Sequence, residues 1–238
     1  MRRARAVATG VGMWLLVALL PAAAEAHLFH QVFEPRDNQL TKDYLVLLRL
    51  IDYPYEKFEL AAAVYRGEQR ARLKPGGVRT WLKRPMEPGM VFKADYQLNR
   101  WTGSLEAECR RLDHAYGTGL HRRVEAGLGA RDAPAVKTAF REMFFHLMRE
   151  MFDAIEGRLG EAEAPPQLYE FLGRYFSVSH EAFLNINDRA SAVMLRALLD
   201  AVERALGDPE RGMPPAPEVF RQQRARFLRT LGEALRRA

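Results

Sequence analysis

The segment from Asp132 to Leu159 constrains the fold of this chain more than any other part of its sequence. Its large apolar residues recur every three or four positions, which is the spacing of one helix face. They are Phe140, Met143, Leu147, Met151, Ile155 and Leu159, flanked by Phe144, Met148 and Phe152. Asp132 is a good N-cap, and Pro134 suits a first helical turn. Such a broad stripe has to be buried against other helices.

Helical spacing also continues on both sides of this segment. Ser104 is the predicted cap of a helix over residues 105–116, and Asn187 or Asp188 that of a helix ending at Gly207. A last predicted helix begins near Pro217, with apolar residues on one side and arginines on the other. The sequence therefore predicts a mainly α antiparallel helical bundle. Its N-terminal third is irregular, and a short β element there is an open alternative.

Two local predictions are less well determined by the pattern. Thr41 is the predicted cap of an apolar segment over residues 42–53, which is either a buried helix or a strand. More broadly, the pattern does not decide between helix and partial strand over residues 42–100. Residues 177–187, SVSHEAFLNIN, are predicted to form a loop between two helices.

The first 26 residues have the pattern of a secretory signal peptide. A basic start precedes the short apolar run MWLLVALL, and the small residues Ala24 and Ala26 suit a signal peptidase. Cleavage after Ala26 leaves His27 as the first residue, with cleavage after Ala24 as the alternative. We therefore expect a cleaved leader over residues 1–26 and one domain over 27–238, located in the periplasm or secreted. No other segment has membrane-spanning length, so no stable membrane insertion is expected after cleavage.

Charge and cysteine content narrow the classes of partner and chemistry. The formal charge of the chain is +6, and losing three arginines and one glutamate with the leader leaves +4. This value is ordinary for a soluble surface, so we expect no nucleic-acid partner. Cys109 is the only cysteine and falls on an apolar stripe, which predicts a buried, inert thiol.

His27 is the principal candidate for metal binding. Once the leader is cut, the α-amino group and the imidazole of this residue can bind the same ion. A second imidazole gives a set of three nitrogen ligands that suits Cu(II), and His30 lies only three residues further on. Alternative sources of that imidazole elsewhere in the fold are His114, His121, His146 and His180. The sequence thus predicts copper at His27 and His30, against the opposing interpretation of a frayed terminus.

Glu142, His146 and Glu150 form a second candidate set, spaced by four residues along one flank of the strongest predicted helix. One imidazole and two carboxylates can bind iron, manganese or zinc. The chain has no Glu-x-x-His motif of the di-iron bundles, however, and charged neighbours surround the three residues. A solvated, charge-paired helix face is therefore the favoured interpretation.

Methionines are a third possible source of metal ligands. Met143, Met148 and Met151 fall within or beside the apolar stripe, so packing in the core explains them. Met86 and Met90 differ, because they flank a Pro-Gly turn in the irregular segment over residues 74–90. They remain a minor metal candidate.

The segment over residues 74–90 also supports an alternative function. It contains three prolines and three glycines, and loops of this length without regular structure are often functional. Trp81, Met86 and Met90 in this segment, together with Trp101, would be exposed anchors, because aromatic residues and methionine are enriched at interface cores. This interpretation predicts a periplasmic adaptor or assembly protein that binds a protein partner through this loop and its helical faces.

Several enzyme motifs do not occur in the sequence. It has no Cys-x-x-Cys-His, no phosphate-binding loop, no Gly-x-Gly-x-x-Gly and no nucleophile elbow. His180 beside Glu181 favours a helix-cap or buried hydrogen-bonding role over that of a base. We therefore expect a non-enzymatic exported binding protein, with copper as its cofactor. An enzyme that uses the N-terminal copper for oxidative chemistry is the weaker alternative.

Overall fold

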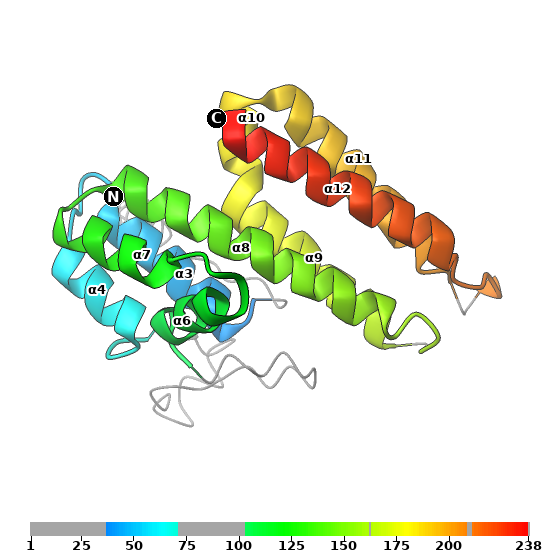
Figure 1. Ribbon diagram of the computed structural model, residues 1–238, viewed down its shortest axis with the longest axis horizontal. Coiled ribbons are helices and arrows are strands. Elements are labelled where there is room, and N and C mark those ends of the chain that lie inside the picture. The colour runs from blue at the N-terminus through cyan, green and yellow to red at the C-terminus, as the bar shows by residue number, and fades with distance from the viewer. Residues whose placement is uncertain (1–36, 71–102, 162, 209–210, 238) are drawn as a thin grey trace, which may run out of the picture. The chain divides into compact units, whose positions relative to one another are not determined.

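The computed structural model describes residues 37–70, 103–161, 163–208 and 211–237, which form helices and no strand (Figure 1). The helices in chain order are α3 (Gln39–Ile51), α4 (Phe58–Arg66), α6 (Leu105–Tyr116), α7 (Leu120–Gly129), α8 (Ala133–Glu156), α9 (Ala164–Phe176), a π-helix (Ser177–Glu181), α10 (Ala182–Asn187), α11 (Arg189–Ala205) and α12 (Pro217–Arg237). The predicted mainly α bundle is confirmed, and the apolar segment over residues 42–53 is helical as far as Ile51.

The longest of the described helices, α8, contacts α6, α7, α9 and α12. Figure 1 shows α8 lying beside α9, and α11 lying beside α12. Short connections make the two helices of each pair antiparallel. The N-terminal helices α3 and α4 pack together, and α4 also contacts α6 and α7. Within the described ranges, no helix combines the length and the apolar character needed to cross a membrane.

The stripe of α8 forms the centre of the hydrophobic core. Asp132 caps the helix by accepting a hydrogen bond from the backbone N–H of Ala135 at 3.0 Å, as predicted. Met143, Met148 and Met151 are at most 1% exposed. They pack in the core with the aromatic side chains of the stripe. The prediction of core methionines on this helix is therefore confirmed.

Besides Asp132, helix caps agree with the sequence at two positions and differ at one. Ser104 caps α6 and Asp188 caps α11, as predicted. The cap of α3 is Asn38 rather than Thr41, because the Asn38 side chain accepts a hydrogen bond from the Thr41 backbone at 3.0 Å. Helix α3 therefore starts at Gln39, earlier than predicted.

The predicted loop over residues 177–187 is wrong. The chain continues from α9 through the π-helix into α10. Serine, valine, histidine and asparagine have modest helix propensities, which made this segment resemble a loop. It contains no glycine or proline, however, and Phe176, His180 and Leu184 are all 0% exposed. Burial of these three side chains, spaced by four, outweighs the weak local propensity.

His180 is buried in this π-helix and has a hydrogen-bonding role. Its ring stacks on Phe176 at an interplanar angle of 6°, and its Nδ1 lies 2.5 Å from the Ser179 hydroxyl oxygen. That hydroxyl donates to the Tyr175 carbonyl, so its oxygen accepts from the Nδ1–H of His180. Burial lowers the pKa of His180 to about 3. A hydrogen bond with the Arg141 backbone raises this pKa, and the positive charge of Arg141 lowers it further. His180 is therefore neutral in the folded protein at ordinary pH.

We expect His180 to make the fold less stable in mild acid. Its pKa is lowered on folding, so the stabilisation is complete above the unfolded pKa of about 6.5 and is lost as the pH falls toward about 3. Between pH 7.5 and 5.5 this residue should reduce the free energy of unfolding by about 1.4 kcal/mol. Urea denaturation at both pH values measures the loss. His180→Gln should remove about that much of the difference, and an unchanged difference in this variant would assign the effect to other groups.

Candidate metal centre

The predicted copper ligands His27 and His30 lie outside the described residues, so the copper site remains a prediction. The predicted partner loop over residues 74–90, which contains Met86 and Met90, also lies outside them.

Three side chains of types that can ligate a metal come together in the described part of the chain. They belong to helices α6 and α7. Glu106 of α6 and His121 and Glu125 of α7 each offer one ligand atom, and these atoms all lie within 4.8 Å of one another. His121 and Glu125 share one face of α7 because they are four residues apart. The Nδ1 atom of His121 lies 3.9 Å from a Glu106 oxygen, and its Nε2 atom lies 3.8 Å from a Glu125 oxygen. We call Glu106, His121 and Glu125 the donor cluster.

Tyr65 of α4 holds the imidazole of the donor cluster in place. Its hydroxyl oxygen lies 3.0 Å from Nδ1 of His121, and the two rings stack at an interplanar angle of 13°. Burial raises the pKa of Tyr65 well above its ordinary value, so the phenol keeps its proton. The nearby Cys109 thiol acts on this pKa in the same direction. In the tautomer in which Nδ1–H donates to the Tyr65 oxygen, the Nε2 lone pair of His121 is left for an ion. Metal-binding histidines are commonly oriented by such a partner.

Cys109 is buried, as predicted from the sequence. The side chain is 0% exposed, and its sulfur lies 3.7 Å from that of Met143. Burial raises the pKa of the thiol to about 12, although the Tyr65 hydroxyl acts in the opposite direction. Cys109 is therefore a protonated thiol and is not part of the donor cluster.

Asp113 fixes the start of α7 and thereby the position of His121. Its carboxylate accepts hydrogen bonds from the Thr118 hydroxyl at 2.6 Å and from the backbone N–H groups of Leu120 and His121 at 2.5 and 3.0 Å. Burial raises the pKa of Asp113, but these hydrogen bonds outweigh it and the net shift is downward. The turn before α7 uses Gly119 at φ +69°, a left-handed conformation that favours glycine.

Arg110 would compete with a metal ion for the Glu106 carboxylate. Its guanidinium lies 2.9 Å from Glu106. The Arg110 side chain is 60% exposed, however, and an exposed ion pair of this kind contributes only about 0–1 kcal/mol. A divalent ion between the carboxylates would therefore displace it at little cost.

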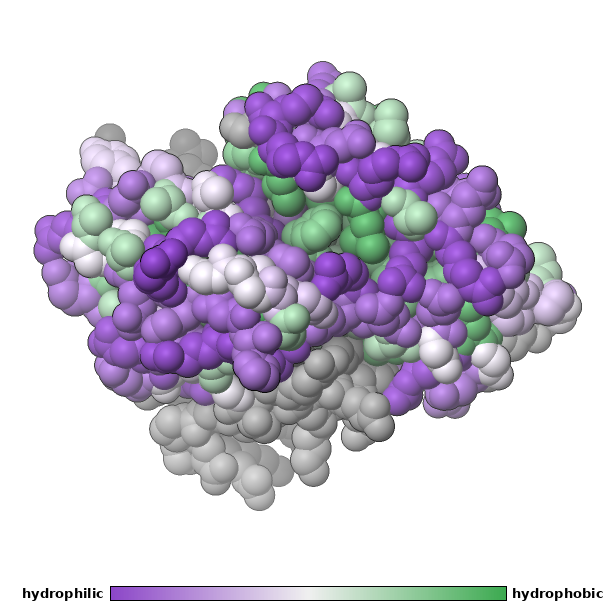
Figure 2. Space-filling model, viewed as in Figure 1, coloured by the Kyte–Doolittle hydropathy of each residue, from purple (hydrophilic) through white to green (hydrophobic). Residues whose placement is uncertain are grey.

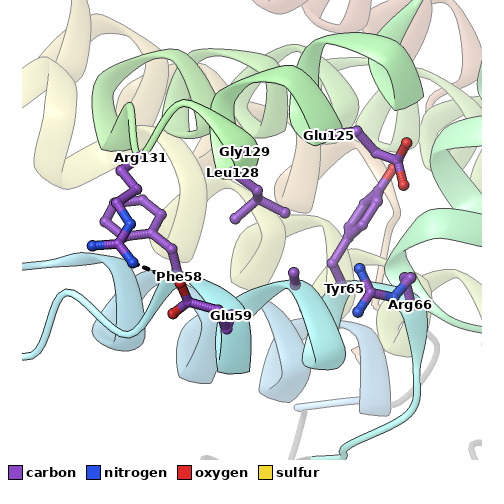
Figure 3. A pocket seen from close by; sticks show the side chains of 9 residues that line it. Phe58, Glu59, Tyr65, Arg66, Glu125, Leu128, Gly129 and Arg131 are labelled. Carbon is purple, nitrogen blue, oxygen red and sulfur yellow. Dashed lines mark hydrogen bonds and ion pairs between the residues drawn. The ribbon is translucent and has the colours of Figure 1, made fainter.

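A cavity of about 270 Å³ between α4 and α7 borders the donor cluster. Figure 3 shows the Glu125 carboxylate at one end of it, near the Tyr65 ring and Arg66. The ion pair of Arg131 with Glu59, 2.6 Å long, lies at the other end (Figure 3). The side chain of Glu125 is 48% exposed. An ion held by Glu125 would therefore be reachable from solvent.

The set of Glu142, His146 and Glu150 does not form a metal site. Each carboxylate pairs with an arginine, Glu142 with Arg123 at 2.6 Å and Glu150 with Arg111 at 2.6 Å. The predicted charge pairing is confirmed, but the predicted solvation is wrong for Glu150, whose side chain is 15% exposed. Sequence spacing did not show that α6 would cover this flank of α8.

The donor chemistry of the cluster suits a divalent transition metal. Imidazole binds zinc, copper, iron and nickel, and carboxylate extends the choice to manganese. Three protein ligands leave a further position open for water. Zinc ligands at about 2.0–2.2 Å from the ion are about 3.4 Å apart in a tetrahedral site, so the cluster has to contract by roughly 1 Å. The exposed side chain of Glu125 has the freedom to do so.

No family model, no curated protein and no solved structure matches this chain. Its function is therefore argued from the donor cluster and the fold around it.

The sequence contained only part of the signal for this site. His121 and Glu125 have the four-residue spacing of paired ligands on one helix face. Glu106 is on a different helix, and Tyr65 is 56 positions from His121. Only the packing of α4, α6 and α7 brings these side chains together.

Proposed function

We propose that this protein is an exported binding protein that holds one divalent transition metal ion at Glu106, His121 and Glu125, with zinc as the best-matched ion. Export rests on the signal-peptide pattern of residues 1–26. The observation that carries metal binding is the convergence of the three donor atoms within 4.8 Å.

Two further features support an ion rather than a chance cluster. Tyr65 restrains the His121 side chain, and Asp113 restrains its backbone. These contacts reduce the conformational entropy that His121 loses when an ion binds. The position of Glu125 beside a solvent-accessible cavity gives an ion a route in and out. The combination favours reversible metal binding over a closed structural site.

The N-terminal copper site proposed from the sequence is a separate site of the same class. It would use the free amine and imidazole of His27 together with His30, and it depends on cleavage after Ala26. The adaptor function depends on residues 74–90 and likewise stays a prediction. Variants of His27 and His121 distinguish the two metal sites, because each removes a ligand from one of them alone.

A zinc titration of the mature protein against a competing chelator tests the donor cluster. We expect Tyr65→Phe to weaken zinc binding by about 10–100-fold, because the partner of the ligand imidazole is lost. His121→Ala should weaken it more, because it removes a ligand. His114→Ala is the matched control, since this histidine is exposed and lies on the neighbouring helix α6. Circular dichroism melting of each variant checks that the fold is intact.

The same titration contains the result that would reject the proposal. Equal zinc affinity in the native protein and in folded His121→Ala would exclude the donor cluster. A loss confined to His27→Ala would place the ion at the N-terminus instead.

A further inference from the structure

A second cavity lies between α8, α10 and the C-terminal part of α12, on other helices than the donor cluster. Its volume of about 480 Å³ falls within the range of small-molecule sites, roughly 300–1,000 Å³. Figure 2 shows apolar residues gathered in the hollow between α8 and α12, within a largely hydrophilic surface. Phe145, Phe183 and Leu235 supply apolar walls. We call this space the α8–α12 cavity.

Arg141 carries an uncompensated positive charge at the wall of the α8–α12 cavity. Its guanidinium carbon lies 3.8 Å from the centre of the Phe183 ring, and it donates a hydrogen bond to the Thr138 hydroxyl. No carboxylate of the described residues forms an ion pair with it. The side chain is partly buried, and this burial lowers its pKa. A guanidinium in this position is stabilised by an anion that enters the cavity.

The carboxylate that lines the same cavity, Glu142, does not form an ion pair with Arg141. Glu142 is bound by Arg123 of α7 at 2.6 Å. Arg236 of α12 adds a second cation to the lining, and it too has no ion-pair partner among the described residues. The lining therefore has an excess of positive charge.

His146 adds a neutral polar group to the wall. Its ring stacks on Tyr116 at 4.7 Å between centroids, and its buried Nδ1 has no hydrogen-bond partner within the described ranges. Burial lowers the pKa of His146, and the nearby Arg149 acts in the same direction. Cation, neutral imidazole and aromatic walls converge on one space, which is the composition of a site for a small ligand.

We propose that the α8–α12 cavity binds a small amphipathic carboxylate, with its anionic group on Arg141 and its aryl or alkyl body between Phe145, Phe183 and Leu235. A carboxylate matches the planar, two-pronged guanidinium. This proposal is independent of metal binding, because the cavity shares no residue with the donor cluster.

Gly232 of α12 provides a way to close the cavity without disturbing the core. A Cβ atom at this position would lie 3.8 Å from the Phe145 ring and 3.7 Å from Arg236, which are ordinary contacts. A longer side chain would extend into space that the glycine leaves open. Replacing a helical glycine also favours the helix, so Gly232→Leu should fold.

Isothermal titration of the full mature protein with 3-phenylpropionate and octanoate tests the proposal, with 3-phenylpropan-1-ol and 1-octanol as neutral counterparts. We expect at least one carboxylate to bind with a Kd below about 1 mM, and its alcohol at least about tenfold more weakly. Arg141→Gln should weaken carboxylate binding by at least about tenfold, and Gly232→Leu should abolish it. Arg229→Gln, an exposed arginine on α12, should bind as the native protein does.

Three outcomes would overturn the proposal. They are the absence of binding by either carboxylate, equal affinity for acid and alcohol, and unchanged affinity in both Arg141→Gln and Gly232→Leu. Zinc affinity should be unchanged in Arg141→Gln and Gly232→Leu. Failure of the cavity proposal can therefore be distinguished from failure of the donor-cluster proposal.

Discussion

Met148→Asp is expected to unfold the protein or to remove most of its stability. The Met148 side chain is 0% exposed in the apolar core around α8. An aspartate there would lose the packing of a buried methionine, which alone is worth about 2–5 kcal/mol. It would also bury a carboxylate that has no hydrogen-bond or charge partner in the apolar core, which adds several kcal/mol to the destabilisation. The sum is comparable with the whole stability of a typical domain, about 5–15 kcal/mol. Thermal melting followed by circular dichroism measures the effect.

The matched control for this substitution is Met194→Asp on α11. Met194 is 50% exposed, so the same change in chemistry occurs largely in water. We expect it to alter the free energy of unfolding by no more than about 0.5 kcal/mol. Similar melting curves for Met148→Asp and the native protein would show that the face of α8 assigned to the core is wrong.

Arg174→Met is expected to destabilise the fold by about 3–5 kcal/mol. Arg174 of α9 binds Asp37 through two hydrogen bonds, at 2.6 and 3.1 Å. The carboxylate is 0% exposed and the guanidinium side chain is 11% exposed. Methionine keeps much of the apolar stem but removes the guanidinium hydrogen-bonded to this buried carboxylate, which leaves Lys42 as a cation near Asp37. The pair also links α9 to the start of α3, so its loss weakens a contact between distant parts of the chain. Urea denaturation measures this difference.

Arg66→Met is the matched control, because it removes an exposed ion pair instead of a buried one. Arg66 and Glu68 form an ion pair whose side chains are 41% and 56% exposed. Exposed pairs contribute about 0–1 kcal/mol, so this variant should be nearly as stable as the native protein. Equal losses in Arg174→Met and Arg66→Met would mean that burial of the Asp37 pair does not matter to stability.

Helices were predictable from the sequence where an apolar face and a cap agreed. The segment beginning at Asp132 combined a cap, an early proline and a long stripe, and α8 begins where these predict. Ser104 and Asp188 similarly marked the starts of α6 and α11. Local chemistry sufficed in these cases because the cap is a contact between residues three positions apart.

Predictions were wrong where tertiary contacts outweighed local preference. The π-helix and α10 replace a predicted loop because buried His180 and Leu184 hold the segment against the core. Glu150 was predicted to face solvent but is covered through its contacts with Arg111 and Tyr116 of α6. Each of these outcomes depends on a partner that is distant in sequence.

The donor cluster illustrates the same limit for a functional site. Metal binding was predicted from histidines that lie close together at one end of the chain, His27 and His30. His121 was only one of four alternatives, because nothing local linked it to Glu106 or Tyr65. The three helices that carry these residues have to pack before the site exists.

The position of zinc in crystals of the zinc-loaded mature protein tests the central claim most directly. Anomalous diffraction at the zinc absorption edge locates the ion without assumptions about its ligands. The proposal predicts one peak between a ring nitrogen of His121 and the carboxylates of Glu106 and Glu125, at about 2.0–2.2 Å from each ligand atom. A peak at His27, with no density at Glu106, His121 and Glu125, would contradict it.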